Sequence, residues 1–215
     1  DDPQTRVMLA YVEGVPNGPE FMRVAREVSR KKPILVLKSG VTESGSRAVS
    51  SHTGSLAGAE AAYDAAFYQA GVLRMNSLEE LFGNARAFAN QPLLNGSRIA
   101  IVTNAGGPGI LATDTLERSG MQLARFEHET VRKLEEFLPD AASVANPVDV
   151  LGDARHDRYA QAMEMIALDP NVDGLLCIVT PQAVTDIVET ANAVGKLSQR
   201  TDKPILAAFM GEERA

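Results

Sequence analysis

The sequence is poor in residues that mark several classes of protein. It has no Trp, an aromatic fraction of 5% and one cysteine, Cys177. Few aromatic side chains leave few platforms for stacking bases, and the net charge of -7 lacks the basic excess that general nucleic-acid binding requires. A single cysteine cannot form an internal disulfide, which favours a reducing compartment.

Long apolar runs are also missing. No stretch approaches the roughly 18 consecutive apolar residues of a membrane span, and the polar start, Asp1 to Gln4, lacks the apolar region of a signal peptide. We therefore predict a cytoplasmic protein without a membrane segment. With 215 residues, 45% of them hydrophobic, the chain has room for one large globular domain or two small ones.

Short aliphatic runs alternate with longer amphipathic stretches along the chain. Near-continuous apolar strands favour parallel sheets covered on both faces, and their alternation with helices predicts doubly wound α/β domains. A connector rich in Asn, Gly and Pro at 90–96 separates a domain at 1–92 from one at 97–215. The expected strands are 7–12, 34–37, 72–74, 99–102, 121–125, 175–179 and 205–209. The expected helices are 19–29, 58–70, 78–89, 109–119, 131–137, 159–168 and 184–197.

An internal repeat predicts that the two domains share a fold. Asp2-Pro3-Gln4 before one strand matches Asp169-Pro170-Asn171 before another, and Lys32-Pro33-Ile34-Leu35 matches Lys203-Pro204-Ile205-Leu206. Two matches in the same order indicate duplicated flavodoxin-like domains. Two βα units precede the repeat in the second copy and none precedes it in the first, so we expect the first domain to lack its opening half.

A glycine-rich turn at 104–109 joins an expected strand to an expected helix. The first N–H groups of a helix have no partners within the helix, and the helix dipole adds positive charge there, so Gly106, Gly107 and Gly109 are candidates to bind an anion. A tight β–α connection that merely packs closely is the alternative. The spacing matches neither a Walker motif nor G-x-G-x-x-G, so no nucleotide is specified.

A second polar segment, 38–58, is long enough to be a functional loop. His52 is its strongest nucleophile near neutral pH, because a neutral imidazole can attack a phosphoryl group without a separate base. A solvated loop histidine is the alternative. His128 and His156 lie among charged residues at helix starts, where we expect them to be solvated. We find no His, Cys and carboxylate spacing that predicts a structural metal.

These motifs resemble those of the ADP-forming (NDP-forming) acetyl-CoA or acyl-CoA synthetases, relatives of succinyl-CoA synthetase. The most specific segments are Lys38-Ser39-Gly40, Ser50 to Gly58, Asn104 to Gly109, and Asn146-Pro147-Val148-Asp149. The resemblance implies that His52 carries a phosphoryl group and that Glu13, at the end of an expected strand, contacts it. Asn146 and Asp149 are weaker candidates, in a segment with no helix or strand pattern. The phosphate-binding candidates are Thr53, Gly54, Asn104, Gly106, Gly107 and Gly109.

The resemblance also implies partners outside this sequence. A CoA-binding domain and an ATP-grasp domain are expected in the same protein or on a second subunit, so this fragment by itself is expected to be inactive. CoA, ADP or ATP, and Mg²⁺ are implied for the full-length protein, inorganic phosphate is an expected partner, and no cofactor is expected within the fragment. The acyl group, the choice of ADP or GDP and a homo-oligomer stay open.

Two other functions stay open at this point. The same domains occur as a ligand-sensing module of protein acetyltransferases, in which the loop histidine is often missing. A binding domain for a phosphorylated ligand is the third hypothesis. Retention of both His52 and Glu13 favours the ligase.

Overall fold

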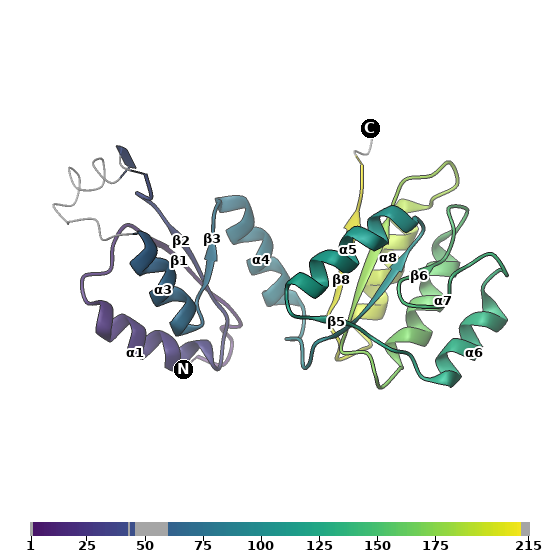
Figure 1. The fold of residues 1–215 in the computed structure, drawn as a ribbon, viewed down its shortest axis with the longest axis horizontal. Helices are drawn as coiled ribbons and strands as arrows, with labels where there is room; N and C mark the ends of the chain where they lie inside the picture. Colours follow the sequence, from purple (N-terminus) through teal and green to yellow (C-terminus); the bar gives the residue numbers. More distant parts are fainter. Residues whose placement is uncertain (1, 43, 46–59, 212–215) are drawn as a thin grey trace. The chain divides into compact units, whose positions relative to one another are not determined.

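A computed structural model describes residues 2–42, 44–45 and 60–211 of the chain. The chain divides into two compact units, Asp1–Asn90 and Gln91–Ala215 (Figure 1). Both are α/β units built on parallel sheets, and both are flavodoxin-like, as the sequence predicts. Among the described residues, no helix is both long and apolar enough to cross a membrane.

Three parallel strands form the sheet of the first unit. They are β1 (Met8–Val12), β2 (Ile34–Lys38) and β3 (Leu73–Met75), in the order β1-β2-β3. The central strand β2 is almost wholly buried, with Leu35 and Val36 at 0% and 1% exposure. Successive side chains of a strand point to opposite faces, so a strand covered on both faces must be apolar at nearly every position.

Helices cover both faces of this sheet. The first face packs against α1 (Gly18–Ser29) and α3 (Glu60–Ala70), in a cluster that includes Phe67. The other face packs against α4 (Leu78–Asn90), in a cluster centred on Leu35 (Figure 1). The predicted helices are confirmed here, with ends that differ by one or two residues.

The second unit has a larger parallel sheet. Its strands are β4 (Arg98–Thr103), β5 (Gln122–Leu123), β6 (Val148–Asp149), β7 (Gly174–Val179) and β8 (Ile205–Phe209). The order is β5-β4-β7-β8, and β6 pairs with β4 further along the edge that β5 occupies. The expectation of no strand pattern at β6 was wrong, because a two-residue strand is too short to show a period.

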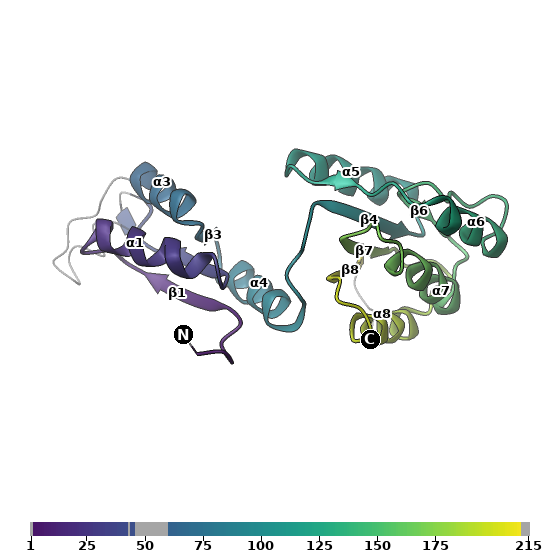
Figure 2. The same cartoon turned by 90° about the horizontal axis from the view of Figure 1, so that it is seen from below.

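Four helices of the described part enclose this sheet. One face carries α5 (Gly106–Arg118), which packs with Ile101, and the opposite face carries α6 (His128–Phe137), α7 (His156–Ala167) and α8 (Ile187–Ser198). Figure 2 shows α5 and α8 on opposite sides of the strands. The sheet is thus covered on both faces, as the near-continuous apolar strands predict.

The internal repeat is reproduced in the pairing of the strands. Met8 of β1 pairs with Ile34 of β2, and the matching residue Leu175 of β7 pairs with Ile205 of β8. The backbone N–H of Met8 donates to the carbonyl of Pro33 at 2.9 Å, and that of Leu175 donates to the carbonyl of the matching proline at 3.0 Å. The two units therefore share one strand–helix–strand arrangement in one register.

The repeated Asp and Lys residues form the same contacts in both units. The carboxylates of Asp2 and Asp169 each accept a hydrogen bond from the N–H two residues ahead, at 3.0 and 2.8 Å. The ammonium groups of Lys32 and Lys203 donate to the main-chain carbonyls of Asp2 and Asp169, respectively. These contacts hold the start of one strand beside the start of its partner. The same residues are needed for this in both units, which explains why the repeat can be detected at these positions.

One ion pair of the second unit is expected to make stability depend on pH. The Arg98 guanidinium donates to both carboxylate oxygens of Asp173, at 2.6 and 2.9 Å, and the N–H groups of Ser97 and Arg98 donate to the same carboxylate. These bonds, chiefly those from the Arg98 side chain, lower the pKa of Asp173 from 3.8 to about 2. The Asp173 side chain is 9% exposed and that of Arg98 is 40% exposed, so solvent screens the pair in part.

We expect this contribution, at most about 2 kcal/mol, to be complete above about pH 5 and to be lost as the pH falls through the folded pKa toward 2. The folded pKa lies below the unfolded pKa, so protonation favours the unfolded chain. Asp173→Asn should therefore lower the free energy of unfolding at pH 7 and differ progressively less from the wild type toward pH 2. Denaturant titrations between pH 7 and 2 measure this. A difference in the free energy of unfolding between Asp173→Asn and wild type that does not change with pH would contradict this prediction. Asp140→Asn, at an exposed position, serves as the control.

Candidate functional site

The carboxyl ends of β1 and β2 lie side by side in the first unit. Val12 pairs with Lys38, and the N–H of Ser39 donates to the carbonyl of Val12 at 3.0 Å. Glu13 follows β1 directly and is exposed. It therefore lies at the edge of the sheet where ligands commonly bind in open α/β folds, next to the start of the 38–58 segment. Three predicted site residues of that segment, His52, Thr53 and Gly54, lie outside the described residues.

Lys38 is a site residue to which the sequence analysis assigned no role. Its side chain is 2% exposed, and its ammonium group donates to the carbonyl of Ser39. The nitrogen lies 4.0 Å from a carboxylate oxygen of Glu60, the first residue of α3, and 4.8 Å from the centre of the Tyr63 ring. A lysine that ends an otherwise apolar strand was the available signal, because a buried cation needs partners.

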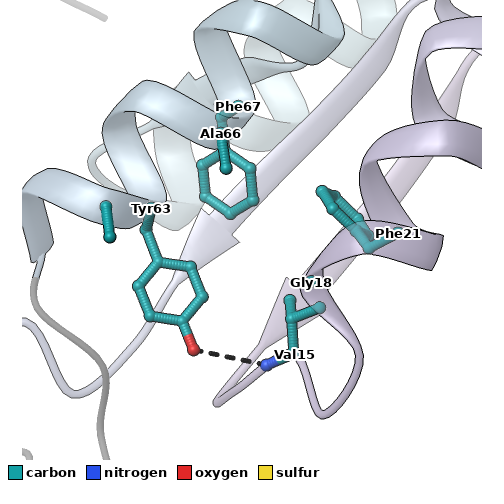
Figure 3. A pocket seen from close by; sticks show the side chains of 7 residues that line it. Val15, Gly18, Phe21, Tyr63, Ala66 and Phe67 are labelled. Atoms are coloured by element: carbon teal, nitrogen blue, oxygen red, sulfur yellow. Dashed lines mark hydrogen bonds between the residues drawn. The ribbon is translucent and has the colours of Figure 1, made fainter.

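The turn after Glu13 is tied to α3 beside a small apolar cavity. The N–H of Val15 donates to the hydroxyl oxygen of Tyr63 at 3.3 Å, and Figure 3 shows this contact among the residues that line the cavity. The volume of the cavity is about 190 Å³. Its walls are Val15, Gly18, Phe21, Ala62, Tyr63, Ala66 and Phe67. The turn that carries Glu13 is thus positioned by a residue of α3.

In the second unit, the N-terminus of α5 matches the predicted anion site in part. Gly106 and Gly107 are exposed, and no side chain among the described residues caps this helix end at Ala105. Pro108 has no N–H to offer. The N–H groups of Gly106 and Gly107 are therefore the donors available to an anion at this helix end.

Gly109 and Asn104, two predicted phosphate-binding residues, both make contacts within the second unit. The N–H of Gly109 points to the carbonyl of Ala105 at 3.5 Å, and a Cβ at Gly109 would lie 3.2 Å from the Thr103 methyl group. The Asn104 amide is 3% exposed and makes three hydrogen bonds to Thr180, at 2.8 to 2.9 Å. The N–H of Gly109 and the side-chain amide of Asn104 are thus both engaged within the protein.

The side chain of Asn146, a weaker candidate, also forms hydrogen bonds with backbone groups. Its amide oxygen accepts from the N–H of Ile101 at 2.9 Å, and its amide nitrogen donates to the carbonyls of Ile99 and Ala124 at 2.8 and 3.0 Å. The side chain occupies the gap between β5 and β6 along one edge of β4. It thus supplies the hydrogen bonds that a continuous strand would supply.

We expect Asn146→Ala to lower the free energy of unfolding by about 2–3 kcal/mol. The substitution leaves the N–H of the fully buried Ile101 without an acceptor, and an unsatisfied buried donor costs about 1–3 kcal/mol on its own. Chemical denaturation of the variant measures the loss. The exposed Asn95→Ala is the control, and equal unfolding midpoints for Asn146→Ala and wild type would contradict the role.

Asp149 is the weaker candidate that does lie near the helix end. One carboxylate oxygen accepts from the N–H of Leu151 at 2.9 Å, and the other lies 4.0 Å from the position that a Cβ of Gly106 would occupy. Leu151 has a φ of 73°, an uncommon value for a residue other than glycine. The Asp149 carboxylate is therefore close enough to the N-terminus of α5 to affect the binding of an anion there.

The other histidines differ from each other. His128 is exposed, as expected. His156 is not simply solvated, because its Nδ1 lies 3.0 Å from a carboxylate oxygen of Asp186. The partner is thirty positions away along the chain, so nothing local in the sequence indicates the pair. Across the described ranges, no group of three His, Cys, Asp or Glu side chains is arranged to hold a metal ion.

Comparison with known proteins places both units. Residues 1–88 match the model of the succinyl-CoA ligase like flavodoxin domain, and residues 99–215 match that of the Ligase-CoA domain. The chain is 44% identical to the alpha subunit of the ADP-forming acetate–CoA ligase II of Pyrococcus furiosus, over 98% of its length. The chain belongs to the ADP-forming acetyl-CoA synthetase family.

Other members of this family agree in sequence and in structure. The ADP-forming acetate–CoA ligase I of Archaeoglobus fulgidus is 45% identical over 99% of this chain. The dinucleotide-forming acetyl-coenzyme A synthetase 1 of Ca. Korarchaeum cryptofilum, solved in complex with phosphate and ADP, is 37% identical with a TM-score of 0.89 over 98% of this chain. The chain spans 47%, 30% and 46% of these three proteins, which are therefore at least twice as long.

Proposed function

We propose that this chain carries the phosphoryl-transfer centre of an ADP-forming acyl-CoA ligase, with His52 as the residue that carries the phosphoryl group. Acyl-CoA and inorganic phosphate would give acyl phosphate and free CoA. The acyl phosphate would pass its phosphoryl group to His52 and leave as the carboxylic acid. The phosphohistidine would then phosphorylate ADP to ATP, and each step is reversible.

The observation that carries this proposal is the position of Glu13. Pairing of Val12 with Lys38 puts Glu13 beside the strand end from which the chain continues toward His52. A carboxylate that accepts a hydrogen bond from one ring nitrogen sets the tautomer, leaves the other nitrogen free to attack and stabilises the cationic ring. The match to the family over both units supports the same assignment.

The second unit is proposed to bind an anion with groups of its own. The N–H groups of Gly106 and Gly107 are suited to bind a phosphate. The helix already orients these donors, so little free energy is spent on reorienting them when negative charge develops on the phosphate. Thr53 and Gly54 adjoin His52 in sequence and are proposed with it. Asn104 and Gly109 would hold the end of β4 and the start of α5 in place.

Further parts of the reaction are proposed to lie outside this chain. The relatives are longer, and the proposal assigns the CoA-binding and nucleotide-binding functions to other domains or to a second subunit. ATP is expected to act with Mg²⁺ there. The relatives described above are ligases, so they do not support the sensing alternative.

Phosphate analysis of the complete protein tests the proposal. After incubation with ATP and Mg²⁺, we expect a mass increase of one phosphoryl group that is lost in acid and retained in base, as for a phosphohistidine. Peptide mapping should locate it on the peptide that contains His52. An unlabelled protein, or a label confined to peptides with His128 or His156, would contradict the assignment.

A further inference from the structure

We propose that Lys38 is a positioning residue of this site, which fixes the turn carrying Glu13 relative to both ends of the segment that contains His52. The inference rests on the proposed function and extends it to a residue that does not contact the transferred group. It starts from a buried ammonium group whose partners lie in two segments, the end of β2 and α3; Tyr63 of α3 in turn contacts a third segment, the turn after Glu13. Those segments meet at the carboxyl end of the first sheet.

The contacts of Lys38 connect the end of β2 to α3 directly and reach the turn after Glu13 through Tyr63. Its bond to the carbonyl of Ser39 holds the chain as it leaves β2. Its approach to Glu60, at 4.0 Å, holds the first turn of α3, where the described chain resumes. Its position over the ring of Tyr63 reaches the residue whose hydroxyl accepts the N–H of Val15, two positions after Glu13.

The charged side chains around Lys38 form ion pairs with each other that do not require Lys38. Glu60 also accepts from Arg74 at 2.6 Å, and Arg74 bonds to Asp64 at 2.5 Å. Without Lys38, Glu60 would still be paired with Arg74 and α3 would still be tied to β3. The substitution should therefore remove the polar contact between the end of β2 and the start of α3 without leaving the Glu60 carboxylate unpaired.

A stabilising role does not explain a cation at this position. A buried ion pair gains little over a well-packed apolar pair, because both charges lose their water. At 4.0 Å, the ammonium and Glu60 are also at the outer limit of an ion pair. An aliphatic residue would complete the apolar strand at least as well, whereas only a long cationic side chain provides these three contacts together.

The test compares Lys38→Met with Lys38→Arg in the complete enzyme. For Lys38→Met, we expect the rate of phosphoryl transfer from labelled protein to ADP, and kcat, to fall on the order of 10²-fold, because small misplacement of reacting groups has effects of that size. The KM values for CoA and ADP should stay within about threefold, since the proposed function assigns the binding of both to other domains or a second subunit. Lys38→Arg keeps the cation and should recover about tenfold of the loss.

Hydrogen exchange gives a reading that does not require activity. In Lys38→Met, amides of residues 13–17 and 39–45 should exchange on the order of tenfold faster, while those of β4 in the other unit should not change. Lys31→Met, which breaks an exposed pair with Glu27, is the matched control and should leave rates and exchange unaltered. Should Lys38→Met fail to fold, Tyr63→Phe, which removes only the acceptor for Val15, should quicken exchange at 13–17 and slow transfer about tenfold.

The two proposals fail in different ways. Wild-type protein that takes no acid-labile phosphate would refute the proposed function, and the exchange measurement would still decide whether Lys38 holds both segments. Labelled wild type together with a Lys38→Met variant that transfers phosphate and exchanges amides at wild-type rates would overturn the role of Lys38. The role of Lys38 would also be overturned if Lys38→Met slowed turnover without changing amide exchange and Lys38→Arg did not restore the rate.

Discussion

His52→Asn is expected to abolish ATP formation from acyl-CoA, phosphate and ADP, with kcat lower on the order of 10⁴-fold or more. The asparagine amide can form hydrogen bonds but has no lone pair able to form a stable P–N bond, so the phosphoryl group loses its carrier. The acid-labile label should disappear in the same variant. Steady-state kinetics and intact mass of the complete enzyme measure both effects.

A matched histidine gives the control for this experiment. His128 is exposed at the first residue of α6, and His128→Asn should keep wild-type turnover and labelling. Turnover in His52→Asn above a few per cent of wild type, with label still present, would rule out His52 as the obligatory carrier.

Glu13→Gln is expected to lower kcat roughly 10³-fold while the protein still folds, because neutralising the carboxylate behind a catalytic histidine has effects of this order. Glutamine has nearly the same shape, but it can present its amide N–H to the imidazole and so favour the wrong tautomer. It also provides no charge to stabilise the cationic ring. Rapid-quench measurement of phosphohistidine formation should show the loss in the chemical step.

The control carboxylate lies nearby on α1. Glu20 is about half exposed and pairs with Arg23, so Glu20→Gln removes the same charge a few residues away and should change the rate less than about twofold. Equal losses in the two variants would mean that overall charge matters and that Glu13 has no particular role. An unchanged rate in Glu13→Gln would remove Glu13 from the mechanism.

The fold was largely predictable from local patterns. Buried parallel strands such as β2 and β7 must be apolar at nearly every position, and each helix must turn one stripe to a sheet, so the order of elements can be read from the chain. The repeat of Asp and Lys residues could be detected in the sequence because the Asp and Lys of each unit make the same contact. The exception was β6, which is short because the side chain of Asn146 takes over part of the pairing with β4.

The candidate site was predictable only in part, because similar residues perform different tasks. Gly106 and Gly109 belong to one glycine-rich turn, yet one presents an exposed N–H and the other allows close packing with Thr103. Asn104 and Asn146 belong to motifs of the family, and both form hydrogen bonds within the second unit. Asn104 bonds to Thr180, and Asn146 bonds to the backbone of neighbouring strands. Residue type and spacing show where polar groups gather, but not which of them are already satisfied.

The sequence by itself determined the α/β class, the duplication and the segments in which the chemistry is proposed to lie. Those features depend on periodicity and on short motifs, which are local properties of the chain. Only the tertiary structure decided that Lys38 reaches Glu60 and Tyr63, that Asp186 partners His156, and which donors at α5 stay available. These outcomes depend on distances between segments remote in sequence, and burial then dictates that each polar group finds its partner there.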